Sequence, residues 1–392
     1  METKKFKTRT IFMERTNGSL PGMWPCAIDV GYSSVKVFSP NMIACFPSFA
    51  KPIDNDVKAV GKFPDEHIIY HDLETDRKWL VGDAAHRDMN QDDTTVSEES
   101  VFGRKRYDDP MFLILVRTGL ALGCMDNSAG VLSGRAIHVQ TGLPPKYLKQ
   151  DSKYMIGAIA GKHVFGLKIG NNEEKRIELE IKREHVDVME QPMGTLMSVS
   201  IDAQHRMIKE ARNYFNSNVL VFDAGFGTLD IFPIINNMVK EKQTFPAFGM
   251  RQVLKKTIDA IYEAYGEEVS MIGMQKCLDT GAVRCSDNFS SEDRPFDAML
   301  EKASHDVCDE ALNKIGSIFK LSEFDYFIVT GGAGAAWNEQ IHEKLKGLHA
   351  LQIVNGNQND TSLPFLFANV RGYFMYRYGK MEALIRKQRR GD

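Results

Sequence analysis

The chain has 392 residues, a formal net charge of -3 and a hydrophobic fraction of 43%, which is typical of a globular protein with two or more domains. This charge excludes a global basic field that would draw the protein onto nucleic acid. No apolar run reaches the length of a membrane span, and the N-terminus has no apolar segment typical of a secretory signal. We therefore expect a cytoplasmic protein without a membrane partner, whose six cysteines are buried free thiols.

Residues 1–23 are expected to form a flexible extension, followed by strands at 24–30, 35–38 and 43–46. The first two strands enclose the hairpin Asp29-Val30-Gly31-Tyr32-Ser33-Ser34. Glycine at a hairpin tip permits positive φ and close backbone approach, so successive N–H groups can bind an anion. The aspartate beside the turn can hold hydrated Mg²⁺. Taken alone, the pattern also fits an ordinary β-hairpin.

An acidic stretch at 88–99 and a basic cluster at 104–106 come next, and we interpret residues of about 40–108 as a small exposed subdomain. Asp109 and Pro110 predict the N-cap and first position of a buried helix at 111–124.

A strand at 136–140 ends in Thr141-Gly142-Leu143-Pro144, and alternating strands follow at 163–169 and 176–182. The segment Glu190-Gln191-Pro192-Met193-Gly194 then opens a helix that is expected to run to about residue 215.

A near copy of the first hairpin begins at residue 218, with Asp223, Gly225, Thr228 and Asp230 in corresponding places. Two such hairpins predict two similar half-domains that enclose a phosphate chain and a divalent metal. Asp230 is also consistent with a purely local cap or pair, so Asp223 is the favoured carboxylate.

Helices are expected at 251–265 and 296–319, where apolar residues recur at helical spacing and indicate core. A strand at 326–330 leads into Gly331-Gly332-Ala333-Gly334, and a last helix is expected at 364–390. Strands and helices alternate, so the fold class is α/β. The expected domains are 24–217 and 218–364, with 365–392 returning to the first.

The order of these elements resembles the actin superfamily, whose elements are called phosphate 1, connect 1, phosphate 2, adenosine and connect 2. Connect 2 corresponds to Phe367-Ala368-Asn369-Val370-Arg371-Gly372. Within the superfamily, the chain is most similar to bacterial ParM-type plasmid-segregation actins. Thr141-Gly142-Leu143-Pro144, the Val186–Gly194 segment and Ala368-Asn369-Val370-x-Gly372 carry that likeness. The resemblance implies an actin-like two-domain ATPase fold with a nucleotide cleft.

The resemblance also implies that the first hairpin holds the β-phosphate and the second the γ-phosphate side, while Asp29 and Asp223 bind hydrated Mg²⁺. The implied nucleotide-binding residues are Gly31, Tyr32, Ser33, Ser34, Lys36, Gly225, Phe226, Gly227, Thr228, Gly331, Gly332 and Ala333.

Gln191 is the candidate for orienting the attacking water, with Glu190 as the alternative, and Asp223 completes the catalytic set. Phosphoryl transfer needs mainly positioning and charge neutralisation, which these residues can supply. Other interpretations stay open, because Lys36 also fits an exposed strand lysine and Gln191 also fits the end of a strand.

The implied function is a filament-forming ATPase that uses ATP, or alternatively GTP, with Mg²⁺. Its expected partners are further copies of itself and a small DNA-binding adaptor that makes DNA contact indirect in plasmid or other DNA segregation. The alternative is a small-molecule kinase of the same superfamily, acting on a sugar or carboxylate through a catalytic aspartate base. A chaperone-like ATPase is disfavoured, because connect 2 lies near the C-terminus and leaves no room for a peptide-binding domain.

Overall fold

The chain folds into two units. The computed structural model describes residues 3–54, 61–89, 103, 106–126, 132–286 and 289–390. The first unit comprises Thr8–Asp88, Glu99–Ile208 and Phe367–Asp392, and the second comprises Met1–Lys7, Met89–Glu98 and Lys209–Leu366. The expected exposure of the acidic and basic runs falls partly outside the described residues, at Asp92, Asp93, Glu98, Glu99, Arg104 and Lys105.

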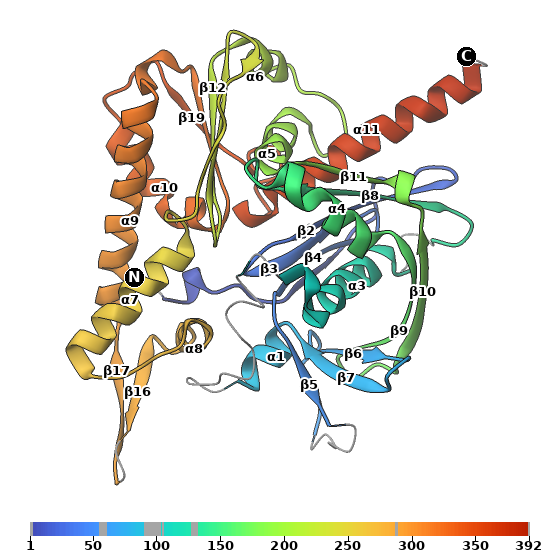
Figure 1. Cartoon of the computed structure of the whole chain (residues 1–392). Coiled ribbons are helices and arrows are strands. Elements are labelled where there is room, and N and C mark those ends of the chain that lie inside the picture. Colours follow the sequence, from blue (N-terminus) through green and yellow to red (C-terminus); the bar gives the residue numbers. More distant parts are fainter. Residues whose placement is uncertain are drawn as a thin grey trace. The chain divides into compact units, whose positions relative to one another are not determined.

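The first unit is built on a sheet with the strand order β1-β4-β3-β2-β8-β11 (Figure 1). Strands β1 to β4 pair antiparallel, whereas β8 and β11 continue the sheet parallel to β2. The strands are β1 (Ile11–Glu14), β2 (Met23–Val30), β3 (Ser34–Phe38), β4 (Met42–Pro47), β8 (Ala136–Leu143) and β11 (Val186–Glu190).

Helices cover both faces of this sheet. Successive side chains of a strand point to opposite faces, and β2 and β3 are buried along nearly their whole length, so both faces need a covering layer. On one face, Trp24 donates its indole N–H to the Gly123 carbonyl of α3 at 2.9 Å. On the other, Phe38 lies 5.1 Å from Phe374 of α11, measured between ring centroids. The helices and short turns of the unit are α1 (Asp83–Arg87), η2 (Arg106–Asp108), α3 (Pro110–Cys124), α4 (Leu148–Ile159), η3 (Arg183–His185), α5 (Gln191–Ser200) and α11 (Ala368–Arg390).

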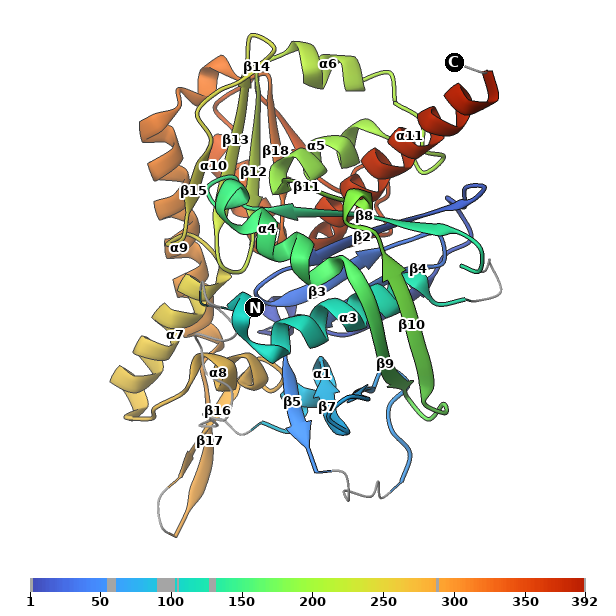
Figure 2. The ribbon, with the colours of Figure 1, turned by 45° about the vertical axis from the view of Figure 1, so that its right-hand side comes forward.

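A second sheet of the first unit has the order β10-β9-β6-β7-β5, with every pair antiparallel (Figure 2). It combines β5 (Ala50–Ile53), β6 (Ile68–Asp72) and β7 (Arg77–Val81) with β9 (Gly161–Ile169) and β10 (Lys175–Ile181). Strands that we placed in a subdomain of about 40–108 therefore pair with strands from 161–181. Sequence periodicity shows that a strand exists but does not show its partner.

The second unit repeats the connectivity of the main sheet. Its order is β14-β13-β12-β18-β19, with β12 and β13 antiparallel and β18 and β19 parallel to β12. In both units two parallel strands add beside the first strand of an antiparallel hairpin, so the expected pair of related α/β halves is confirmed. The strands are β12 (Val219–Ala224), β13 (Leu229–Ile235), β14 (Met238–Val239), β15 (Gln243–Phe245), β18 (Tyr326–Thr330) and β19 (Gln352–Asn355), with the two-stranded ribbon β16 (Ala282–Ser286) and β17 (Ser291–Pro295).

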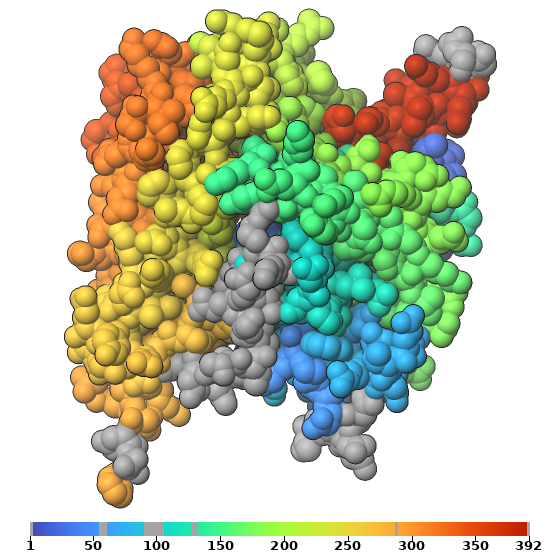
Figure 3. All heavy atoms as spheres, in the orientation of Figure 1, coloured from blue at the N-terminus to red at the C-terminus, as the bar shows by residue number. Residues whose placement is uncertain are grey.

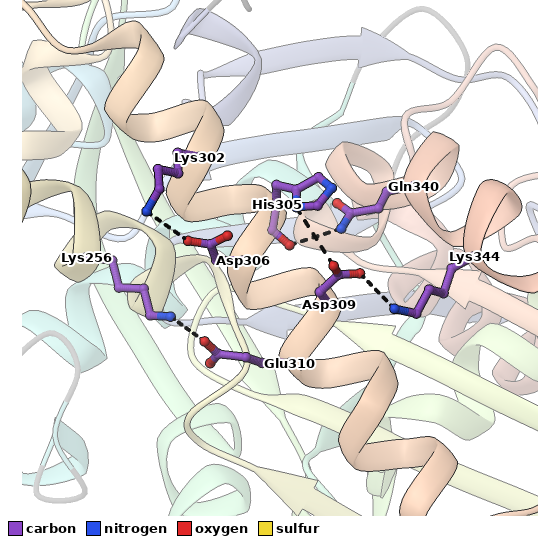
Figure 4. A network of polar contacts seen from close by, with 8 residues as sticks. All are labelled: Lys256, Lys302, His305, Asp306, Asp309, Glu310, Gln340 and Lys344. Atoms are coloured by element: carbon purple, nitrogen blue, oxygen red, sulfur yellow. Dashed lines mark hydrogen bonds and ion pairs between the residues drawn. The ribbon is translucent and has the colours of Figure 1, made fainter.

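Polar contacts tie the surface of three helices of the second unit together (Figure 4). Lys256 of α7 pairs with Glu310 of α9 at 2.6 Å, and Asp309 of α9 pairs with Lys344 of α10 at 3.4 Å. Exposed pairs of this kind contribute little stability, so buried packing holds the helices. The helices and turns are η1 (Thr3–Phe6), α6 (Ala211–Asn216), α7 (Met250–Tyr265), α8 (Met271–Cys277), α9 (Asp297–Ile318), η4 (Leu321–Glu323), α10 (Gly332–Leu345) and, at the unit boundary, η5 (Phe365–Phe367).

The first 23 residues differ from the flexible extension that we expected. In the first unit β1 pairs with β4, and in the second unit the Thr3 hydroxyl donates to the Leu278 carbonyl at 2.8 Å. Lys7 pairs with Asp279 and Phe6 is buried. A four-residue strand among polar residues carries too weak an alternation to be recognised before its partner is known.

The single helix expected from residue 191 to about 215 is wrong. Helix α5 ends at Ser200, Ile201 forms a β-bridge with Met207, and α6 begins at Ala211. The Asp202 carboxylate accepts the backbone N–H groups of Gln204 and Arg206, both at 2.9 Å. Local side-chain acceptors of this kind compete with helix propagation.

No helix among the described residues is long and apolar enough to cross a bilayer. The cysteines are all free, and five of the six are buried.

Helices α11 and α5 approach each other closely at glycine. The last turns of α11, red in Figure 3, project beyond the elements on which the helix packs. A Cβ on Gly372 would lie only 1.6 Å from the Gly194 carbonyl oxygen. We expect Gly372→Ala to separate the helices and lower the free energy of unfolding by about 3 kcal/mol or more, measured by chemical denaturation. The matched control is Gly379→Ala on the same helix, where a Cβ meets no atom within 4 Å. It should be neutral or stabilising by up to about 1 kcal/mol; equal losses in the two variants would contradict the packing.

Candidate functional site

The first hairpin closes through one short backbone bond. The Gly31 N–H donates to the Ser34 carbonyl at 3.0 Å, which leaves Tyr32 and Ser33 at the tip. A Cβ on Gly31 would lie 2.9 Å from that same Ser34 oxygen, so the turn needs glycine for close backbone approach.

The second hairpin closes in the same way, because the Gly225 N–H donates to the Thr228 carbonyl at 2.9 Å. A Cβ on Gly225 would make only an ordinary contact of 3.4 Å. Neither Gly31 nor Gly225 has a φ in the left-handed range, so the positive φ that glycine permits is not used at either position. The duplication seen in the sequence is nevertheless a duplication of backbone geometry.

Ser48, which the sequence did not single out, holds the tip of the first hairpin. Its hydroxyl donates to the Gly31 carbonyl at 2.9 Å, and its N–H donates to the Ser33 carbonyl at 3.0 Å. A trans peptide places its C=O and N–H on opposite sides. Fixing the Gly31 carbonyl on Ser48 therefore directs the Tyr32 N–H away from Ser48.

The start of α7 holds the second tip. The N–H groups of Met250 and Arg251 donate to the carbonyls of Gly225 and Phe226 at 3.1 and 2.8 Å. By the same peptide geometry, the N–H groups of Phe226 and Gly227 are directed away from α7. A Cβ on Gly249, the N-cap of α7, would lie 2.5 Å from the Phe226 carbonyl oxygen. Gly249 was not among the residues singled out from the sequence. Its place directly before the apolar stripe of α7 is the sequence signal that could have indicated this contact.

Asp29 is almost fully buried at the end of β2, on the sheet face that α11 covers. Its two carboxylate oxygens have different partners, because Lys36 Nζ lies 2.9 Å from Oδ2 and Gln191 Nε2 donates to Oδ1 at 3.3 Å. Lys36 faces Asp29 directly in the strand register. The first unit thus brings three predicted residues together, while Glu190 ends β11 beside Gln191.

Asp223 has the opposite kind of neighbour. Asp230 takes the register position that Lys36 takes in the first hairpin, and both aspartates are buried. Burial, reinforced by the Asp223 carboxylate, raises the pKa of Asp230 to about 8. The hydroxyls of Thr228 and Thr244 donate to Asp230 at 3.1 and 2.5 Å. The Thr228 hydroxyl proton, which we expected on a phosphate, is therefore used within the hairpin.

The glycine-rich turn after β18 lies against the second hairpin. Gly331 has a φ of +84°, and a Cβ there would lie 2.1 Å from the Ala224 carbonyl oxygen and 2.9 Å from Asp223 Oδ1. Only glycine fits this position. The Cβ direction of Gly332 is open, with no atom within 4 Å, whereas Ala333 is buried. The backbone at Gly332 can therefore be approached closely.

The two sets of residues fit the nucleotide and metal that the resemblance implies. Oriented amides at two tips suit phosphate oxygens, and a carboxylate beside each tip suits hydrated Mg²⁺. The first unit assembles Asp29, Gly31, Tyr32, Ser33, Ser34, Lys36, Glu190 and Gln191. The second assembles Asp223, Gly225, Phe226, Gly227, Thr228, Gly331, Gly332 and Ala333.

The raised pKa of Asp230 predicts a pH-dependent stability. Between the ordinary carboxyl pKa and about 8 the folded chain binds a proton that the unfolded chain releases, so this contribution is complete at low pH and is lost as pH rises through about 8. We expect the thermal midpoint of the wild type to fall from pH 5 to pH 9 more steeply than that of Asp230→Asn, a neutral variant of the same shape. Parallel pH profiles of the two proteins would contradict a protonated Asp230.

Comparisons with known proteins agree with this geometry. Residues 27–194 match the family model for the N-terminal domain of actin-like proteins. The solved structure named "pCBH ParM non-polymerisable quadruple mutant" is 19% identical with a TM-score of 0.68, covering 92% of this chain and 99% of that chain. A 15-stranded ParM filament from Clostridium botulinum is 16% identical with a TM-score of 0.66, covering 91% and 99%. Actin-like protein Alp7A is 14% identical with a TM-score of 0.62, covering 94% and 99%.

A comparison with curated protein sequences finds no match. The family match includes the first hairpin and Gln191, and the structural likeness extends over both units. The chain therefore has the actin-like fold, and its residues 27–194 match the model of actin-like N-terminal domains.

Proposed function

We propose that this protein is an actin-like ATPase that assembles into dynamic filaments when it binds ATP and Mg²⁺. One observation carries the proposal: two hairpins on halves with the same strand order each hold an outward-directed amide and a buried aspartate at the tip. A single phosphate-binding hairpin would have no need of such a copy. Both hairpins therefore serve one nucleotide in this proposal.

The residues divide the work of phosphoryl transfer between the hairpins. The amides of Tyr32 and Phe226 bind phosphate oxygens, and Asp29 and Asp223 hold the hydrated metal. Bound Mg²⁺ neutralises charge on the phosphates. Gln191 donates its amide N–H to Asp29 at 3.3 Å, which leaves its carbonyl oxygen to accept a hydrogen bond from the attacking water. Glu190 is the alternative for that role.

The filament part of the proposal is supported by the likeness to a ParM filament from Clostridium botulinum. ATP favours the polymer and hydrolysis weakens it. A formal net charge of -3 fits indirect DNA contact through a small DNA-binding adaptor, in the cytoplasm, better than direct binding. The role in plasmid or other DNA segregation is part of the same proposal, with GTP as the second candidate nucleotide.

Right-angle light scattering and phosphate release, measured together after adding ATP and Mg²⁺, test the function. We expect scattering to rise above a critical protein concentration and to decay as phosphate accumulates. Asp223→Asn should slow phosphate release at least about tenfold, because a metal-binding carboxylate is lost.

The matched control is Asp306→Asn on the exposed face of α9, which should keep the wild-type rate of phosphate release. Phosphate release without scattering at any concentration would contradict the filament and favour a small-molecule kinase. Wild-type turnover in Asp223→Asn would contradict the assigned site.

A further inference from the structure

Arg106, which lies outside the predicted site, grips the first hairpin on both sides of Gly31. Its Nη2 donates to the carbonyl of Val30, the residue before Gly31. Its guanidinium lies 4.6 Å from the ring centroid of Tyr32, the residue after Gly31. One side chain thus touches both neighbours of the glycine that closes the turn.

The guanidinium of Arg106 is deeply buried, since the residue is only 7% exposed. Burying a cation is costly unless nearby groups compensate for its lost hydration. Here the compensation comes from the Val30 carbonyl and from aromatic faces, with Phe112 at 5.0 Å and Tyr32 at 4.6 Å. Because Arg106 is buried and donates to the Val30 carbonyl, it fixes the position of that carbonyl.

The short turn η2 that carries Arg106 is itself held in place. The neighbouring Tyr107 hydroxyl donates to Asp151 of α4 at 3.2 Å, and its ring packs edge-on against Phe112 of α3 at 4.9 Å. Asp109, which follows the turn, caps α3 by accepting the Met111 N–H at 2.8 Å. Arg106 is therefore presented to the hairpin from a short turn that is anchored on α3 and α4.

We infer that Arg106 is a positioning residue for the nucleotide site, and this inference rests on the proposed function. Because Arg106 holds the Val30 carbonyl, the Gly31 N–H is directed to the opposite side, where it meets Ser34. Because Arg106 stacks on Tyr32, this tip residue, whose N–H binds phosphate in the proposed function, keeps one orientation. Pre-organising a phosphate-binding turn raises affinity, since less conformational freedom is lost on binding.

A double-mutant cycle on nucleotide affinity tests the inference. The Kd for a fluorescent ATP analogue with Mg²⁺ is measured well below the thermal midpoint of each variant. Arg106→Met and Tyr32→Leu should each weaken binding about tenfold. The double variant should bind no more weakly than Arg106→Met alone, because both substitutions remove the same stacking of Arg106 on Tyr32. The single variant Tyr32→Phe keeps the aromatic face, so it should bind the analogue with wild-type affinity, unlike Tyr32→Leu. A role in folding alone would not produce this pattern.

The matched control is Arg176→Met, which removes an exposed arginine of β10 in the same unit and should leave the Kd unchanged. If the wild type binds the analogue and Arg106→Met binds it equally tightly, the inference is overturned but the proposed function is not. Additive losses that reach about a hundredfold in the double variant would also overturn it. A wild type that does not bind the analogue would instead overturn the proposed function together with the inference.

Discussion

The proposed nucleotide binding depends on the orientation of peptide planes at two hairpin tips, one in each unit. A trans peptide cannot turn its C=O one way without turning its N–H the other way. Ser48 holds the Gly31 carbonyl, and the first turn of α7 holds the carbonyls of Gly225 and Phe226. Different elements thus impose one result in both units, which is an amide directed outward from the tip. The shared sheet connectivity places an aspartate beside each of these amides.

The two hairpins differ in charge although they agree in backbone geometry. Across the ladder from Asp29 stands Lys36, whereas Asp230 stands across from Asp223. The first pair balances its charge through an ion pair, and the second does so through a proton, since burial raises the pKa of Asp230 to about 8. Each solution removes the cost of burying an unpaired carboxylate. The two halves are therefore related in fold but are not interchangeable in chemistry.

Part of this structure could be predicted from the sequence. The hairpins, the long helices and the α/β class follow from local periodicity and from the repeated Asp-x-Gly pattern, and the actin-like fold is confirmed. The partners of β9 and β10, the pairing of β1, and Ser48 depend on contacts between distant segments, which periodicity does not encode. The helix break at Ile201 depends on the Asp202 carboxylate accepting the N–H groups of Gln204 and Arg206. The roles of the candidate site residues stay predictions.

The most direct test is an experimental structure of the protein with Mg²⁺ and a non-hydrolysable ATP analogue. The proposed function predicts one nucleotide whose phosphate oxygens accept hydrogen bonds from both the Tyr32 and Phe226 N–H groups. It also predicts a hydrated metal near Asp29 and Asp223. A nucleotide whose phosphates touch only one hairpin, or one bound elsewhere on the chain, would contradict the claim that the duplicated hairpins form one site.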